Sequence, residues 1–102
     1  MEAIVGRRSS SEHDLSEYAQ IFKALSDVTR QGILILLKEG PRSVNEIVSN
    51  FTLAQPTISR HLAVLRQAGL VASKRSSQHM IYRIVPENLR RCCEGFAKRF
   101  CS

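Results

Sequence analysis

A chain of 102 residues is long enough for one domain with a modest hydrophobic core. Fifteen Lys and Arg residues against nine Asp and Glu residues give a formal net charge of +6, which favours association with polyanions without specifying which polyanion. No apolar run approaches the ~20 residues of a membrane span, and the opening segment lacks the apolar core of a secretion signal. We therefore expect a cytoplasmic protein without a membrane partner.

The first half of the chain predicts a flexible arm followed by two helices. Residues 1–13 are polar and without hydrophobic period, which is typical of an arm, and residues 14–102 predict the folded domain. Asp14 and Glu17 have the spacing of a capping box, so we expect a helix from residue 14 to about residue 25. A second helix should begin at Asp27 or Val28 and continue to Glu39. Its residues 33–37 are all apolar, which is typical of a central core helix.

The middle of the chain predicts a helix-turn-helix. Ser43 and Glu46 repeat the capping-box spacing and predict a short helix to about residue 50. After a turn over residues 51–54, a second helix with a proline in its first turn should end at Gly69. Its apolar stripe predicts one buried face, formed by Ile58, Leu62 and Leu65. Two short helices joined by a tight turn constitute a helix-turn-helix.

Beyond Gly69 the hydrophobic period changes from helical to strand-like. Residues 70–74 and 80–85 predict two short strands, and the polar residues 75–79 predict the connection between them. A final helix should begin at Pro86 and continue to about residue 100. A helix-turn-helix followed by a basic hairpin is a winged helix. The expected fold class is therefore mostly α with a small β-hairpin, in the order α-α-α-α-β-β-α.

Four segments of the chain, in order, resemble the ArsR/SmtB family of bacterial and archaeal repressors. They are FKALSDVTR at residues 22–30, the apolar residues 33–37, QPTISRHLAVL at residues 55–65 and AGLV at residues 68–71. The resemblance implies a homodimer that pairs through its first and last helices and binds an imperfect palindrome in its own promoter. Two positions depart from the family pattern: Val28 stands where proline is usual, and Ala54 stands where the recognition helix often has a serine cap.

The resemblance also implies which residues contact DNA. Polar groups near the start of the helix that ends at Gly69 suit a major groove. Amide and guanidinium groups there can reach base edges, and hydroxyls can reach phosphates. Gln55 is best suited to an adenine edge, and Arg60 to guanine or phosphate. The helix contacts implied are Gln55, Thr57, Ser59, Arg60 and His61, and the wing contacts are Lys74, Arg75, Gln78 and His79.

Many family members release DNA when a metal binds, but neither common metal site of the family matches this sequence. Residues 43–48 contain no cysteine, and residues 86–102 contain no Asp and no His. Instead, all three cysteines, Cys92, Cys93 and Cys101, lie in the last eleven residues. Some family members sense arsenite or antimonite through C-terminal cysteines, and soft thiolates suit such ions.

The spacing of the cysteines limits such a site. On one straight helix Cys93 and Cys101 are ~12 Å apart along the axis. The three thiols could meet only if the helix ends near residue 99, or if the partner subunit contributes. A redox or sulfur-species switch and a repressor without any inducer are the open alternatives.

Two other classes of protein are alternatives to a DNA-binding repressor. The three histidines fall in the arm, the recognition helix and the wing, without a nucleophile or carboxylate at partner spacing, so we do not expect an enzyme. A winged-helix protein-interaction module that does not bind DNA is the stronger rival. Such a module would tend to carry apolar or acidic residues where this chain has Gln55, Thr57, Ser59 and Arg60.

Overall fold

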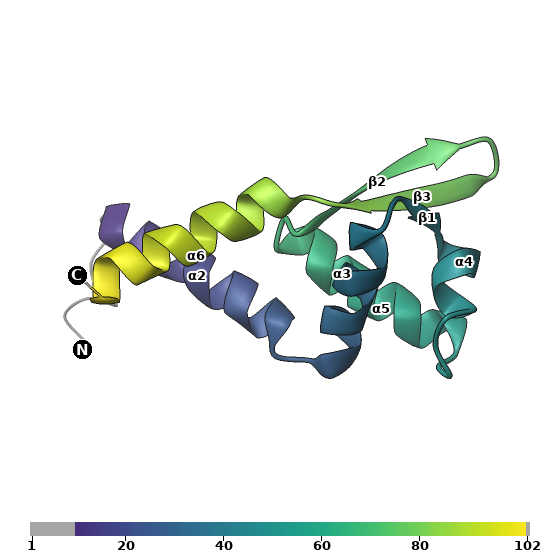
Figure 1. The fold of residues 1–102 in the computed structure, drawn as a ribbon, viewed down its shortest axis with the longest axis horizontal. Coiled ribbons are helices and arrows are strands. Elements are labelled where there is room, and N and C mark those ends of the chain that lie inside the picture. Colours follow the sequence, from purple (N-terminus) through teal and green to yellow (C-terminus); the bar gives the residue numbers. More distant parts are fainter. Residues whose placement is uncertain (1–9, 102) are drawn as a thin grey trace.

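The computed structural model describes residues 10–101, which form two helical arms at one end and a winged helix-turn-helix at the other (Figure 1). The first helix, α2 (Ser10–Leu25), begins four residues before the predicted start at Asp14. The predicted helix start is therefore wrong by four residues, and residues 1–9 of the predicted flexible arm lie outside the described part. The capping-box spacing of Asp14 and Glu17 predicted the wrong start, because Asp and Glu also occur inside helices.

The second helix, α3 (Val28–Lys38), begins where the sequence predicts. Asp27 is its N-cap, and its carboxylate accepts a 3.1 Å hydrogen bond from the backbone N–H of Arg30. Ile33, Leu34 and Leu37 are buried, but Ile35 is 65% exposed. The helix is central to the fold, yet it is not covered on all sides as its apolar run suggested.

The helix-turn-helix is formed by α4 (Val44–Val48) and α5 (Gln55–Gln67). The predicted capping box of α4 is confirmed: Ser43 N–H donates to Glu46 Oε1 at 2.8 Å, and Glu46 N–H donates to Ser43 Oγ at 3.2 Å. This helix ends two residues earlier than predicted.

The recognition helix α5 has the predicted buried face and the predicted stop. Ile58, Leu62 and Leu65 are fully buried. Gly69 has φ +77, and the N–H of Leu70 donates to the carbonyl of Leu65 at 3.0 Å, so the helix ends in a Schellman motif. Only a residue without Cβ adopts that backbone conformation without strain.

Three strands form the sheet in the order β1-β3-β2, all antiparallel. The hairpin strands β2 (Val71–Ser76) and β3 (His79–Ile84) are longer than predicted at the tip, so only residues 77 and 78 form the turn. The short strand β1 (Arg42–Ser43) pairs with β3 and was not predicted, because two residues carry no periodicity. The sheet thereby anchors the wing to the start of α4.

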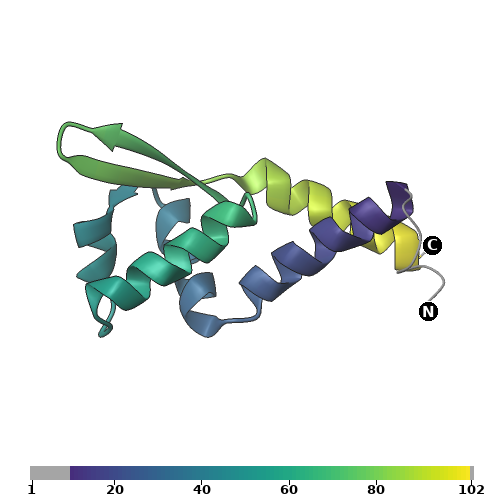
Figure 2. The ribbon, with the colours of Figure 1, turned by 180° about the vertical axis from the view of Figure 1, so that it is seen from behind.

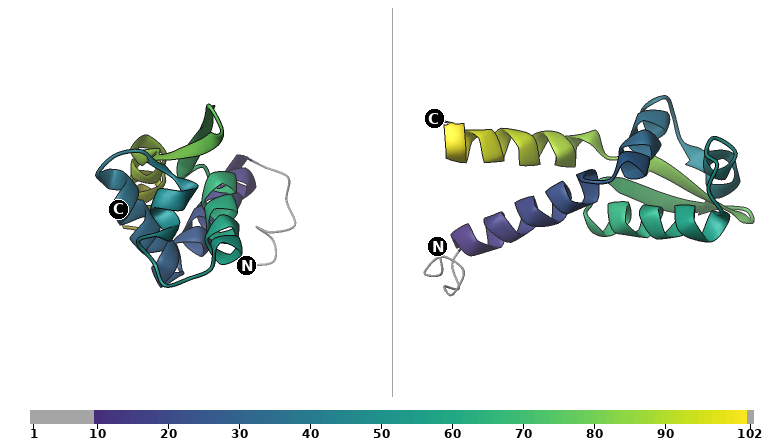
Figure 3. Two further views of the ribbon diagram at one scale, coloured as in Figure 1. Left: turned by 90° about the vertical axis from the view of Figure 1, so that its right-hand side faces the viewer. Right: turned by 90° about the horizontal axis from the view of Figure 1, so that it is seen from below.

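The last helix, α6 (Pro86–Cys101), packs beside α2 through aromatic rings. The ring of Phe96 lies 4.8 Å from that of Phe22 and 5.5 Å from that of Tyr18, both edge to face. Seen from behind and from below, the pair leaves the body on the side opposite the hairpin tip (Figures 2 and 3). The core that joins the two ends is formed by buried side chains of α3, α4 and α5, together with residues of α2, β2 and α6.

Candidate nucleic-acid interface

The outer face of α5 presents a polar surface opposite its buried stripe. At about 100° per residue, Arg60 lies almost opposite Ile58, with Gln55 and Ser59 on one flank and Thr57 and His61 on the other. Gln55, Ser59 and Arg60 are exposed, whereas Thr57 is half-buried. Figure 2 shows α5 along its whole length at the front of the molecule. Three of the five predicted helix contacts are therefore exposed on this polar surface.

His61 differs from the other predicted helix contacts, because its ring is engaged inside the protein. Its Nδ1 lies 3.2 Å from Nη1 of Arg30, and the residue is half-buried. This contact links α5 to the start of α3. Sequence reasoning missed Arg30 as a site residue, since nothing in the local pattern indicates which long-range partner a guanidinium will meet.

The four predicted wing contacts, Lys74, Arg75, Gln78 and His79, are all exposed at or near the hairpin tip. The strand register places these residues on different faces of the hairpin. Arg75 pairs with Met80, and Ser73 with Tyr82, so Arg75 shares a face with residues that pack on the core. Lys74 and His79 lie on the opposite face, and Gln78 lies in the turn.

Two further cations, one on the hairpin and one at the end of α5, were not among the predicted contacts. Arg83 is exposed, lies directly opposite Ala72 and shares the face of Lys74. Arg66, in the last turn of α5, donates a 3.4 Å hydrogen bond to Ser73 Oγ of β2. Side chains alternate between the two faces of a strand, so a known hairpin register would have predicted that Arg83 shares the face of Lys74.

The three cysteines do not come together within one chain. Because α6 is continuous through Cys101, the condition that the helix end near residue 99 is not met. Cys92 is buried, whereas Cys93 and Cys101 are exposed. Within residues 10–101, no group of three His, Cys, Asp or Glu side chains is placed to hold a metal ion.

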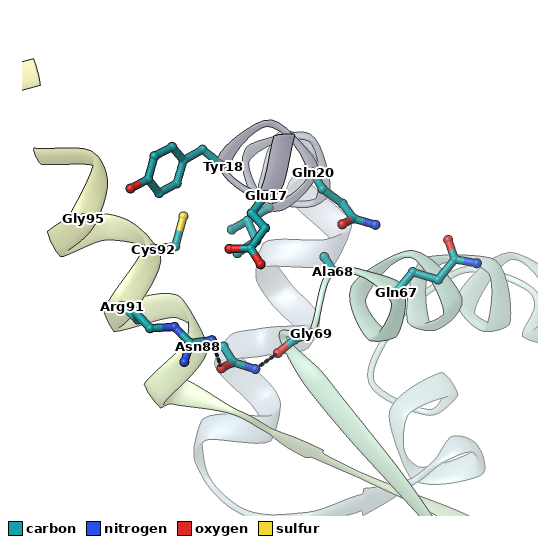
Figure 4. Close-up of a pocket in the computed structure, with 11 residues that line it drawn as sticks. Glu17, Tyr18, Gln20, Gln67, Ala68, Gly69, Asn88, Arg91, Cys92 and Gly95 are labelled. Carbon is teal, nitrogen blue, oxygen red and sulfur yellow. Dashed lines mark hydrogen bonds between the residues drawn. The ribbon is translucent and has the colours of Figure 1, made fainter. Parts of the chain in front are cut away.

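Cys92 lines a cavity of about 420 Å³ between α2, α6 and the C-terminal end of α5. Figure 4 shows its sulfur pointing from α6 towards α2, near Glu17 and Tyr18. Burial raises the pKa of the Cys92 thiol, and the neighbouring Cys93 and Glu17 raise it further. The thiol is therefore protonated at neutral pH and a poor nucleophile there.

Comparison with known proteins agrees with this architecture. The family described as "Bacterial regulatory protein, arsR family" matches residues 27–73. The chain is 42% identical over 62 residues to the transcriptional repressor SdpR of Bacillus subtilis, covering 61% of this chain and 69% of that protein. It is 43% identical over 68 residues to the arsenical resistance operon repressor of Escherichia coli, covering 66% of this chain and 58% of that protein.

Among solved structures, one similar fold is the homodimeric winged helix-turn-helix DNA-binding domain of Mb0332 from Mycobacterium bovis, a possible ArsR-family regulator. It has a TM-score of 0.77 at 28% identity, covering 92% of this chain and 88% of that one. None of the helices in the described range is long and apolar enough to cross a membrane. The chain belongs to the ArsR/SmtB family of winged helix-turn-helix proteins and is a DNA-binding transcriptional repressor rather than an enzyme.

Proposed function

We propose that two copies of this chain pair through α2 and α6 and bind a palindromic operator in the cytoplasm, blocking transcription. The observation that carries the proposal is the exposed polar face of α5 with a cationic hairpin beside it. Arg60 lies on the helix surface opposite the buried stripe, and Lys74 and Arg75 extend the positive charge onto the wing. This arrangement suits base edges in the major groove and phosphates at its rim.

An apolar surface on α6 supports pairing of two copies. Phe96 packs against α2, but the adjoining Phe100 is 58% exposed, with its ring 4.6 Å from that of Phe96. Cys93 and Ala97 lie on the same outer side of the helix as Phe100, and both are exposed. Covering this surface with a second copy would remove apolar area from water. A two-fold dimer would place its recognition helices ~34 Å apart, one turn of DNA.

We assign the reading of bases to Gln55 and Arg60, and contacts near the backbone to Thr57, Ser59 and His61. In the wing we assign phosphate contacts to Lys74 and Arg75, with Gln78 and His79 beside them at the tip. Each cation that neutralises a phosphate releases a counterion and steepens the salt dependence of binding. Removing Lys74 or Arg75 should therefore weaken binding to all duplexes and lower the salt slope by about one.

The operator can be found by selecting duplexes from a random pool with the purified, reduced protein. Recovery of a palindrome with half-sites one helical turn apart, bound by two copies of the chain, is the expected result. Failure to enrich any sequence would favour a winged-helix protein-interaction module.

For an inducer, the arsenic-resistance repressor among the relatives makes arsenite and antimonite the first ions to test. Because one α6 cannot gather the three thiols, such a site would combine Cys93 or Cys101 with thiols of the partner subunit. Oxidation or persulfidation of the exposed cysteines is the second candidate. The test titrates the repressor–operator complex with arsenite and with a persulfide donor. If wild type and the triple Cys→Ser variant respond identically, the thiols carry no signal and repression is independent of an inducer at these residues.

A further inference from the structure

The side chain of Arg30 joins three helices. Its Nε donates a 2.6 Å hydrogen bond to the carbonyl of Ala24, and its Nη2 donates a 3.0 Å bond to the carbonyl of Lys23, both in the last turn of α2. Its Nη1 lies 3.2 Å from Nδ1 of His61 in α5. Since Arg30 itself lies in the first turn of α3, its guanidinium connects α2, α3 and the recognition helix α5.

The contact with His61 fixes the protonation pattern of the imidazole. A guanidinium has donors and no acceptor, so Nδ1 of His61 must accept this hydrogen bond and cannot carry a proton. The neutral ring then carries its proton on Nε2. With Nδ1 engaged inside the protein, the Nε2–H group is the donor left for a partner outside it.

Asp27 holds the backbone of Arg30 in place beside this contact. Asp27 accepts a hydrogen bond from the backbone N–H of Arg30, and this bond lowers the pKa of the Asp27 carboxyl. The carboxylate therefore stays ionised and offsets the guanidinium charge. The nearby Lys23 offers its backbone carbonyl to Arg30.

The position of His61 on α5 indicates what its free donor can reach. It lies about 60° around the helix from the buried Ile58, whereas Arg60 lies on the outermost face. In a helix-turn-helix the residues at the N-terminal end of the recognition helix contact base edges, and Gln55 lies there. His61 lies six residues further along and beside the buried face, where the DNA groups within reach are phosphates at the rim of the major groove.

We propose that Arg30 is a positioning residue that holds His61 in the Nε2–H tautomer, and that this N–H donates to a DNA phosphate beside the recognition helix. The second part rests on the proposed function. Since a neutral donor releases no counterion, the contact adds affinity for every duplex without steepening the salt dependence.

The first experiment concerns the protein without DNA. Long-range ¹H–¹⁵N correlation spectra of the imidazole distinguish a protonated ring nitrogen from an unprotonated one. In the reduced 102-residue chain above pH 7, we expect His61 to show an unprotonated Nδ1 and a protonated Nε2. In Arg30→Gln the ring should show a mixture of tautomers. A His61 ring protonated on Nδ1 in the wild type would overturn the proposal.

The second experiment measures DNA binding with two substitutions that separate the ring nitrogens. Asn places an amide near the position of Nδ1 and nothing at Nε2, whereas Gln reaches the position of Nε2. We expect His61→Asn to lower affinity for operator and for unrelated duplexes alike, by about tenfold, with an unchanged salt slope. His61→Gln should retain more of the affinity than His61→Asn.

The outcomes separate this inference from the function it rests on. If wild type shows no preference for any duplex, the proposed function fails, while the tautomer measurement still tests the role of Arg30. If wild type discriminates but His61→Asn binds as tightly as wild type, the phosphate contact is wrong. An effect of His61→Asn confined to thermal stability, or matched by His61→Gln, would likewise reject it.

Discussion

Asn88, in the first turn of α6, donates a 2.8 Å hydrogen bond from Nδ2 to the carbonyl of Gly69, at the end of α5 (Figure 4). A second bond runs alongside it, from the N–H of Val85 to the carbonyl of Leu70 at 2.9 Å. The helix proposed to mediate dimerisation is thereby tied to the end of the helix proposed to read DNA. A change in the relative position of two paired α6 helices would be transmitted to both recognition helices through this contact.

Replacing Asn88 by Ala should lower both stability and operator affinity. The half-buried bond to Gly69 would be lost, which typically costs about 1 kcal/mol of unfolding free energy. Thermal melts and operator titrations measure the two effects. Asn45→Ala is the matched control, because Asn45 is exposed on α4. Equal effects of the two substitutions on operator affinity would contradict the coupling.

Replacing Ala54 by Ser should stabilise the protein. Ala54 is the N-cap of α5, has extended backbone angles and makes no side-chain cap hydrogen bond. A serine there can accept a bond from the first turn, and such caps contribute about 0.5–2 kcal/mol. Ala63→Ser, at an exposed position inside the same helix, should instead be slightly destabilising. Denaturant unfolding of both variants tests the assignment, and a loss of stability in Ala54→Ser would refute it.

The capping box of α4 should contribute to the pH dependence of stability. Hydrogen bonds from the backbone and side chain of Ser43 lower the pKa of Glu46. A carboxyl with a lowered folded-state pKa stabilises the fold above its unfolded pKa, and this contribution is lost as pH falls through the folded value. We therefore expect wild type to lose more stability than Glu46→Gln on acidification below about pH 4.

Melting temperatures measured from neutral to acidic pH test this expectation. Glu94→Gln, an exposed change on α6, should keep the acid sensitivity of wild type. Parallel pH profiles for wild type and Glu46→Gln would count against the capping box as a source of stability.

Replacing Arg60 by Ala should reduce discrimination between operator and unrelated DNA while leaving the fold intact. The side chain is exposed on the outer face of α5, so little packing is lost. A good base contact contributes about 1–3 kcal/mol of discrimination. Fluorescence anisotropy with operator and scrambled duplexes measures the ratio. Arg90→Ala removes the same charge from α6 and should leave the ratio unchanged; an unaltered ratio in Arg60→Ala would reject its role.

The sequence predicted those parts of the fold that depend on local patterns. The capping box at Ser43 and Glu46, the stripe of Ile58, Leu62 and Leu65 and the glycine stop at Gly69 are each short-range features with one favourable backbone solution, and all three are confirmed. The family, and with it the repressor class, followed from motifs at residues 22–30, 33–37, 55–65 and 68–71.

The features that the sequence missed depend on long-range contacts. The pairing of Arg42 with Tyr82 creates β1, and a strand of two residues is too short for a sequence pattern to predict it. The contact between Arg30 and His61 joins residues from different helices, so neither residue type nor spacing predicts which ring nitrogen is engaged. The exposure of Ile35 likewise depends on what the neighbouring elements leave uncovered.

A pair of these chains is proposed to recognise a specific DNA sequence. Sedimentation velocity of the reduced protein, alone and with the selected duplex or a scrambled one at moderate ionic strength, tests it in one measurement. We expect a dimer without DNA, and a complex of one dimer per selected duplex at concentrations where the scrambled duplex stays free. A monomer that sediments independently of both duplexes, or equal binding to the two, would contradict it.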